Sequence, residues 1–134
     1  MGKQGIEAYS FLKGVKRIFL DTMFFIYHFE NNARFLHLTT DVLGFVEDGK
    51  IQCSTSHLTL MEILVKPMKG DRQDIVEAYK MVFETFPNLE LVPLEKSVAH
   101  TAAYFRSSYN LKPADSIQLS AAVASNSGRN SKEE

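Results

Sequence analysis

Short apolar runs and longer stretches with helical spacing alternate along the chain. Three short runs, each bounded by Gly, Pro or Asn on at least one side, predict buried strands at residues 15–20, 51–54 and 89–93. Elsewhere apolar side chains recur every three or four residues, as they do on the buried face of a helix. The pattern predicts helices over residues 35–47, 58–66, 71–86 and 98–109, with Asp71 as an N-cap, and a last helix that begins near Pro113.

The order of these elements predicts the fold class. Strands that alternate with helices are typical of a parallel sheet built from right-handed crossovers. We therefore expect an α/β fold with a parallel sheet, in a single domain over residues 15–124. Residues 1–14 form an N-terminal extension in this scheme. Residues 125–134 are polar and rich in Ser and Asn, and they are expected to be unstructured.

Composition narrows the class of protein. The chain has 134 residues, 45% of them hydrophobic, which suffices for one core but not for two ordinary domains. The single cysteine, Cys53, excludes an intramolecular disulfide and favours a reducing, cytoplasmic setting. A net charge of −1 excludes a strongly basic nucleic-acid binder. The most apolar stretch, residues 18–29, is shorter than the roughly 18 residues that a membrane span needs, so no membrane association is expected.

Three of the acidic residues lie in apolar surroundings. Asp21 directly follows the first predicted strand, Glu62 lies inside the apolar stretch 58–65, and Asp115 opens the last predicted helix. A carboxylate among apolar neighbours is costly unless it is paired or bound to a metal. Two of them also have a structural interpretation, because Asp21 could be an N-cap and Asp115 a first-turn acid favoured by the helix dipole. Glu62 is harder to explain in this way, since Glu is rarely buried without a partner.

Their expected position in the sheet favours a shared site for these three carboxylates. Ligands of open α/β sheets bind beyond the carboxyl ends of the strands, where Asp21 lies and where the helices of Glu62 and Asp115 would approach. Three carboxylates that converge there would repel one another without a cation. Mg²⁺ or Mn²⁺, hard ions that prefer oxygen ligands, would relieve this repulsion. We therefore predict that Asp21, Glu62 and Asp115 form a metal site.

At these residues the chain resembles the PIN-domain family, whose typical members are VapC-like toxin ribonucleases of bacterial toxin–antitoxin pairs. In that family an Asp ends the first strand, a Glu lies in a helix after the second strand, and an Asp opens a later helix. Asp21, Glu62 and Asp115 occupy these positions here. The resemblance implies a three-layer α/β/α fold. It lies in IFLDTMFFIYHFENN (residues 18–32), STSHLTLMEIL (54–64) and LKPADSIQLSAAV (111–123).

The resemblance also implies an activity and partners. It implies a divalent-metal-dependent endoribonuclease that hydrolyses RNA phosphodiesters, with a cognate antitoxin protein and a homodimeric assembly. Asp21, Glu62 and Asp115 would be both catalytic and metal-binding, with Mg²⁺ or Mn²⁺ as the cofactor. Thr22 could orient a metal-bound water or cap the following helix. Five basic side chains near the acids are candidates for phosphate contact, with a solvated surface as their alternative role: Lys66, Lys69, Arg72, Arg106 and Lys112.

The chain departs from the family pattern after Asp115. Family members continue into a further strand that ends in a fourth acid, whereas the residues from Ser125 onward are polar. Glu133 and Glu134 lack an apolar strand before them, so neither is assigned the fourth role. This departure supports a second hypothesis, a catalytically weak or inactive PIN-like module that binds RNA or a protein. The missing strand would lie beside the first, so residues 18–20 are expected to form an exposed edge that favours self-association.

Overall fold

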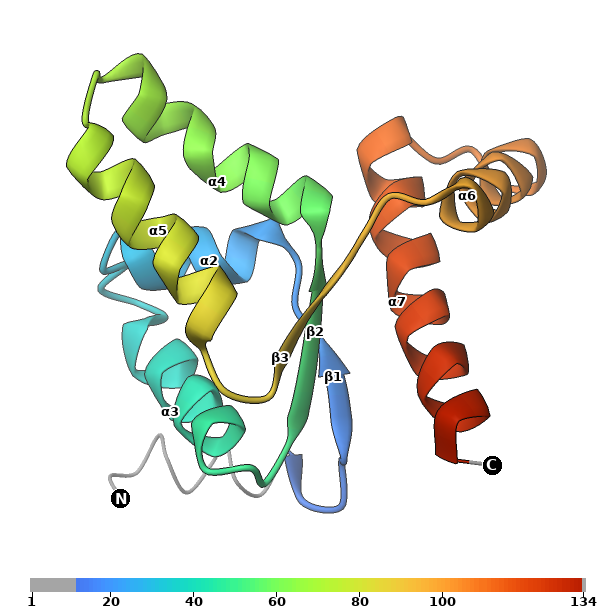
Figure 1. Cartoon of the computed structure of the whole chain (residues 1–134), viewed down its shortest axis with the longest axis horizontal. Coiled ribbons are helices and arrows are strands. Elements are labelled where there is room, and N and C mark those ends of the chain that lie inside the picture. The colour runs from blue at the N-terminus through green and yellow to red at the C-terminus, as the bar shows by residue number, and fades with distance from the viewer. Residues whose placement is uncertain (1–11, 134) are drawn as a thin grey trace.

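A computed structural model describes residues 12–133 of the chain, with side chains up to residue 126. Residues 1–11 of the N-terminal extension, residue 134 and the side chain of Glu133 therefore lie outside the described part. Strands and helices alternate as the sequence predicts (Figure 1). Their bounds in chain order are β1 (Arg17–Phe19), α2 (Thr22–Phe29), α3 (Leu36–Glu47), β2 (Gln52–Ser56), α4 (His57–Lys69), α5 (Gln73–Thr85), β3 (Leu89–Val92), α6 (Lys96–Ser108) and α7 (Pro113–Glu133).

The three strands form one parallel sheet in the order β1-β2-β3. In register, Ile18 of β1 lies beside Cys53 of β2, and Ser54 of β2 lies beside Glu90 of β3. Helices α2, α3, α4 and α5 lie on one face of the sheet, and α6 and α7 lie on the other (Figure 1). The predicted three-layer α/β/α fold with a parallel sheet is therefore confirmed. Within the described residues β1 lies at the edge of the sheet, while residues 18–20 are half-buried and the missing neighbouring strand stays a prediction.

A separate hydrophobic cluster fixes the helices on each face. On one face Phe25 of α2, Ile63 of α4 and Phe83 of α5 are buried together, and the ring centroids of Phe25 and Phe83 are 5.0 Å apart. On the other face Val98 of α6 and Ala121 of α7 pack with β3. These contacts hold α4 and α7 on opposite sides of the sheet. Both helices begin at the end of the sheet where β2 ends (Figure 1).

Two local predictions differ from the structure. Asp71 is not the N-cap of α5, because Arg72 occupies that position and makes no capping bond through its side chain. Asp71 instead takes a left-handed conformation (φ 56°) in the turn between α4 and α5. Helix α7 continues to Glu133 across the polar stretch that was expected to be unstructured. That stretch contains no proline, and extending an existing helix costs far less than nucleating one.

His28 in α2 makes the stability of this fold sensitive to pH. The Thr39 hydroxyl donates to the carbonyl of Leu36, so the His28 ring donates from Nδ1 to Thr39 Oγ1, at 3.0 Å. Burial lowers the pKa of His28 below its ordinary value of 6.5. The folded state therefore disfavours the protonated ring, and this contribution to stability is present above pH 6.5 and is lost as the pH falls towards the folded-state pKa.

We expect His28→Asn to make the stability less dependent on pH. Asn can replace the Nδ1 donor towards Thr39, but it does not titrate. Urea unfolding at pH 7.5 and 5.5 measures the effect, and the wild-type chain should lose more free energy of unfolding over this interval than the variant does. Equal losses in the two proteins would show that protonation of His28 does not oppose folding.

Candidate active site at the carboxyl edge of the sheet

Asp21 lies at the carboxyl end of β1 and begins α2. It is the N-cap of that helix, where its Oδ1 accepts a hydrogen bond from the Phe24 N–H at 3.3 Å. The capping interpretation of Asp21 is thus confirmed. The side chain is exposed, and among the described residues its second oxygen, Oδ2, accepts no hydrogen bond. The cap therefore leaves one carboxylate oxygen available to a ligand.

Glu62 lies on α4 and is held by the residue that follows Asp21. The Thr22 hydroxyl donates to Glu62 Oε1 at 2.7 Å, across the junction between α2 and α4. Thr22 is buried and Glu62 is half-buried. The capping role considered for Thr22 is wrong, because Asp21 caps α2. The mid-helix carboxylate of Glu62 thus has a hydrogen-bonded partner that fixes its direction.

A polar network links the starts of α2, α4 and α7. Gln118 of α7 donates from Nε2 to the hydroxyls of Thr22, at 3.2 Å, and Thr59, at 2.9 Å. Its Oε1 accepts a hydrogen bond of 2.5 Å from Ser56, whose hydroxyl also caps α4 through the Thr59 N–H. Ser56 and Thr59 are almost completely buried. One glutamine therefore joins three elements that are far apart in the sequence.

Each of the three acids lies one or three residues along the sequence from a member of this network. Asp21 is adjacent to Thr22, while Glu62 lies three residues after Thr59 on α4 and Asp115 lies three residues before Gln118 on α7. Residues three apart on a helix share a face. The network thus brings the chain segments that carry the three acids to one end of the sheet.

In the structure the three carboxylates are not grouped into a set of metal ligands. Asp115 is exposed in the first turn of α7, as its structural interpretation predicted. Among the residues that the structure describes, no three His, Cys, Asp or Glu side chains are grouped closely enough to hold a metal ion. The structure brings together Thr22 and Glu62 directly, whereas a shared site with Asp21 and Asp115 stays a prediction.

The five candidate cations differ in what they already contact. Lys66 forms an ion pair with Glu30, with Nζ and Oε1 2.6 Å apart, and Arg72 forms a two-bond ion pair with Asp74. The guanidinium of Arg106 instead donates to a backbone carbonyl, that of Leu111. Within the described residues, three of the five form no ion pair and remain available to an anion: Lys69, Arg106 and Lys112.

Sequence reasoning missed Ser56, Thr59 and Gln118. Two signals point to them in retrospect, since Ser56 stands where an N-cap is expected between strand and helix, and Gln118 is a lone amide between Ile117 and Leu119. Neither signal identifies a partner, because Gln118 is 96 residues from Thr22 and 59 from Thr59.

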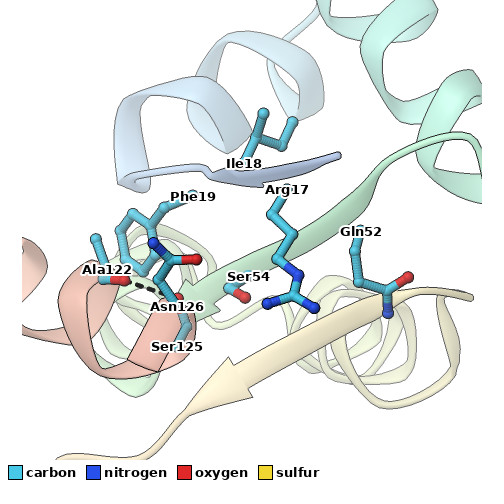
Figure 2. A pocket seen from close by; sticks show the side chains of 8 residues that line it. All are labelled: Arg17, Ile18, Phe19, Gln52, Ser54, Ala122, Ser125 and Asn126. Carbon is cyan, nitrogen blue, oxygen red and sulfur yellow. Dashed lines mark hydrogen bonds between the residues drawn. The ribbon is translucent and has the colours of Figure 1, made fainter. Parts of the chain in front are cut away.

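A separate pocket lies between β1, β2 and the C-terminal part of α7 (Figure 2). The described residues of its lining include no carboxylate, and Figure 2 shows the guanidinium of Arg17 lying between the side chains of Ser54 and Gln52. The pocket therefore lacks the acids of the candidate site. Its lining residues are Arg17, Ile18, Phe19, Gln52, Ser54, Ala122, Ser125 and Asn126.

Comparison with known protein families identifies the family of the chain. A family model described as PIN domain matches residues 18–128, which is well over half of the 134-residue chain. The matched range contains all three acids and every member of the polar network. Neither a curated protein nor a solved structure matches the chain. Across residues 12–133, none of the helices is both long and apolar enough to cross a membrane.

Proposed function

The chain belongs to the PIN-domain family, and we propose that it is a metal-dependent endoribonuclease whose site is formed by Asp21, Glu62 and Asp115. PIN domains are generally nucleases that use divalent metal ions. The observation that supports a site at these three acids is the network around Gln118, which links the chain segments that bear them.

The donor chemistry of the proposed site fits a hard divalent cation. All three side chains offer carboxylate oxygens, the ligands that Mg²⁺ and Mn²⁺ prefer. Glu62 gives one oxygen to Thr22 and keeps the other, and Asp21 likewise gives one oxygen to the N-terminus of α2. When bound, such an ion lowers the pKa of the attacking water and stabilises charge on the leaving oxygen.

Neighbouring residues of the chain orient the Glu62 carboxylate of the proposed site. Thr22 directs the Glu62 carboxylate, because its single hydroxyl proton is donated to Oε1 while its oxygen accepts from Gln118. The burial of Thr22 and Thr59 keeps water from competing for these bonds. In this proposal Thr22 and Gln118 are positioning residues, and the three carboxylates are the catalytic residues.

Cleavage of RNA by the purified chain tests this function. We expect hydrolysis of a single-stranded oligoribonucleotide in Mg²⁺ or Mn²⁺ and its loss in excess EDTA, with activity restored when the metal is returned. Cleavage that persists at full rate in EDTA would contradict the metal dependence.

A second candidate function has an observation in its favour. The carboxylates of the described residues are not grouped as a ligand cluster, which suits a PIN-like module that binds RNA or a protein without cutting. RNA binding without cleavage in either metal would favour this module over the ribonuclease.

The biological setting is also a proposal. A VapC-like toxin would be neutralised by a cognate antitoxin and would form a homodimer, in keeping with β1 as an edge strand. Growth arrest on expression of the wild-type chain, relieved by Asp21→Asn, is the expected result for a toxin. Unimpaired growth at high expression would contradict it.

A further inference from the structure

Three aromatic side chains form a row at the C-terminal end of α6. The ring centroids of Tyr104 and Phe105 are 5.9 Å apart, and those of Phe105 and Tyr109 are 6.5 Å apart. Phe105 is half-buried, whereas Tyr104 and Tyr109 are 61% and 62% exposed. Within the described part of the chain, these two are the exposed aromatic residues, since every other Phe and Tyr there is buried or half-buried.

The surroundings of this aromatic row are positively charged. Residues 104–112, which contain the aromatic row, have two cations, Arg106 and Lys112, and no acid, a net charge of +2, and the next acid along the chain is Asp115. Residues 57–85, on the other side of the sheet, contain four cations and five acids, which gives 4 − 5 = −1. Residues 12–20 carry a larger charge, +3, but they contain no exposed aromatic side chain. Within the described part of the chain, net positive charge and exposed aromatic rings therefore coincide at residues 104–112.

These cations are also not neutralised by ion pairs. Arg106 donates to the Leu111 carbonyl, which leaves its charge in place, and Lys112 forms no ion pair with a described residue. By contrast, Lys66, Arg72 and Lys80 of α4 and α5 each face a carboxylate. Lys69 of α4 also forms no ion pair with a described residue, but no exposed aromatic ring lies near it in the sequence. Arg106 and Lys112 therefore combine uncompensated positive charge with exposed rings, since both are within three residues of Tyr104 or Tyr109 in the sequence.

The aromatic row lies at the same end of the molecule as the candidate active site. Tyr109 is the C-cap of α6, and Asp115 follows six residues later in the first turn of α7. Figure 1 shows the connection between α6 and α7 at the end of the sheet where α4 begins. An RNA strand bound along this connection would thus pass near Asp115, which lies three residues after Lys112 in the sequence.

We propose that this surface, formed by Tyr104, Arg106, Tyr109 and Lys112, binds single-stranded RNA. The exposed tyrosine rings stack on bases, and the two cations contact phosphates. A duplex is a poorer ligand, because its bases already stack on one another and are not presented to side chains. The role of this RNA as substrate rests on the proposed function, while binding itself does not.

Fluorescence anisotropy with a labelled 12-nucleotide oligouridylate, measured in EDTA, tests the surface without any cleavage. We expect Tyr104→Ala with Tyr109→Ala to weaken binding by about tenfold or more, and Tyr104→Phe with Tyr109→Phe to retain it. Arg106→Gln with Lys112→Gln should lower the slope of log affinity against log salt by about 1.4, because each cation that neutralises a phosphate contributes about 0.7. Met81→Ala and Lys16→Gln, which remove an exposed apolar side chain and an exposed charge elsewhere, are the matched controls.

The outcomes separate this surface from the proposed nuclease. RNA binding that depends on the two tyrosines, without cleavage, supports the surface and contradicts the nuclease. Metal-dependent cleavage by the wild-type chain, together with wild-type RNA binding by the double Ala variant, supports the nuclease and contradicts the surface. A duplex that binds as tightly as the single strand would also overturn the surface. Sedimentation velocity covers the remaining possibility: if the double Ala variant dissociates a dimer and still binds RNA normally, the tyrosines form a protein interface and the proposal is wrong.

Discussion

Replacement of Asp21 by Asn is expected to reduce RNA cleavage about a thousandfold while changing the stability of the fold very little. Asn is as good an N-cap as Asp, so the hydrogen bond to the Phe24 N–H can be kept. What the substitution removes is the negative charge of a proposed metal ligand. Stabilisation by a bound metal contributes several kcal/mol to the transition state, and each 1.4 kcal/mol corresponds to a factor of about ten in rate.

Two further variants make this result specific to Asp21. Asp74→Asn removes an exposed acid that is paired with Arg72, away from the site, and should leave cleavage unchanged. Asp21→Ala removes both charge and cap, and should lose about 1 kcal/mol of stability in addition to activity. If Asp21→Asn cleaved RNA at the wild-type rate, the residue would be only a helix cap and the assignment of the site would be wrong.

Replacement of Gln118 by Leu is expected to lower the free energy of unfolding by about 2 kcal/mol. Leu has a similar size, but it cannot donate to Thr22 and Thr59 or accept from Ser56. Burying a polar group without a partner costs about 1–3 kcal/mol. Because the bond from Thr22 to Glu62 would lose its support, kcat should fall together with stability, with KM for RNA less affected.

Urea unfolding measures this loss against a matched control. Gln73→Leu replaces a glutamine on the exposed face of α5, where its amide contacts Glu77, and should change stability by less than about 0.5 kcal/mol. Equal stability of the two variants would mean that the network around Gln118 does not hold the segments of the site together.

Much of the fold could be predicted because its signals are local. The three strands are short apolar runs with turn residues beside them, and the helices carry a regular apolar face. Cys53, a small apolar side chain within the second of these runs, has no exposed surface. The position of Asp21 at the carboxyl edge also followed from local order, since it comes immediately after the apolar run that forms β1.

The arrangement inside the site depends on contacts that no local pattern encodes. Gln118 reaches Thr22 and Thr59 only because α7 packs on one face of the sheet and α4 on the other. Lys66 is neutralised by Glu30, which lies 36 positions away in the turn after α2. The local sequence therefore could not show that Lys66 is paired while the nearby Lys69 is not. In the same way, spacing alone could not distinguish exposed Tyr104 and Tyr109 from the buried aromatic residues.

Binding of Mn²⁺, followed by electron paramagnetic resonance, tests most directly whether Asp21, Glu62 and Asp115 belong to one site. We expect the wild-type chain to bind Mn²⁺, and we expect Asp21→Asn, Glu62→Gln and Asp115→Asn each to weaken binding at least about tenfold, since all three side chains supply preferred oxygen ligands. Asp74→Asn should bind as the wild-type chain does. Wild-type affinity in any one of the three site variants would contradict the shared metal site.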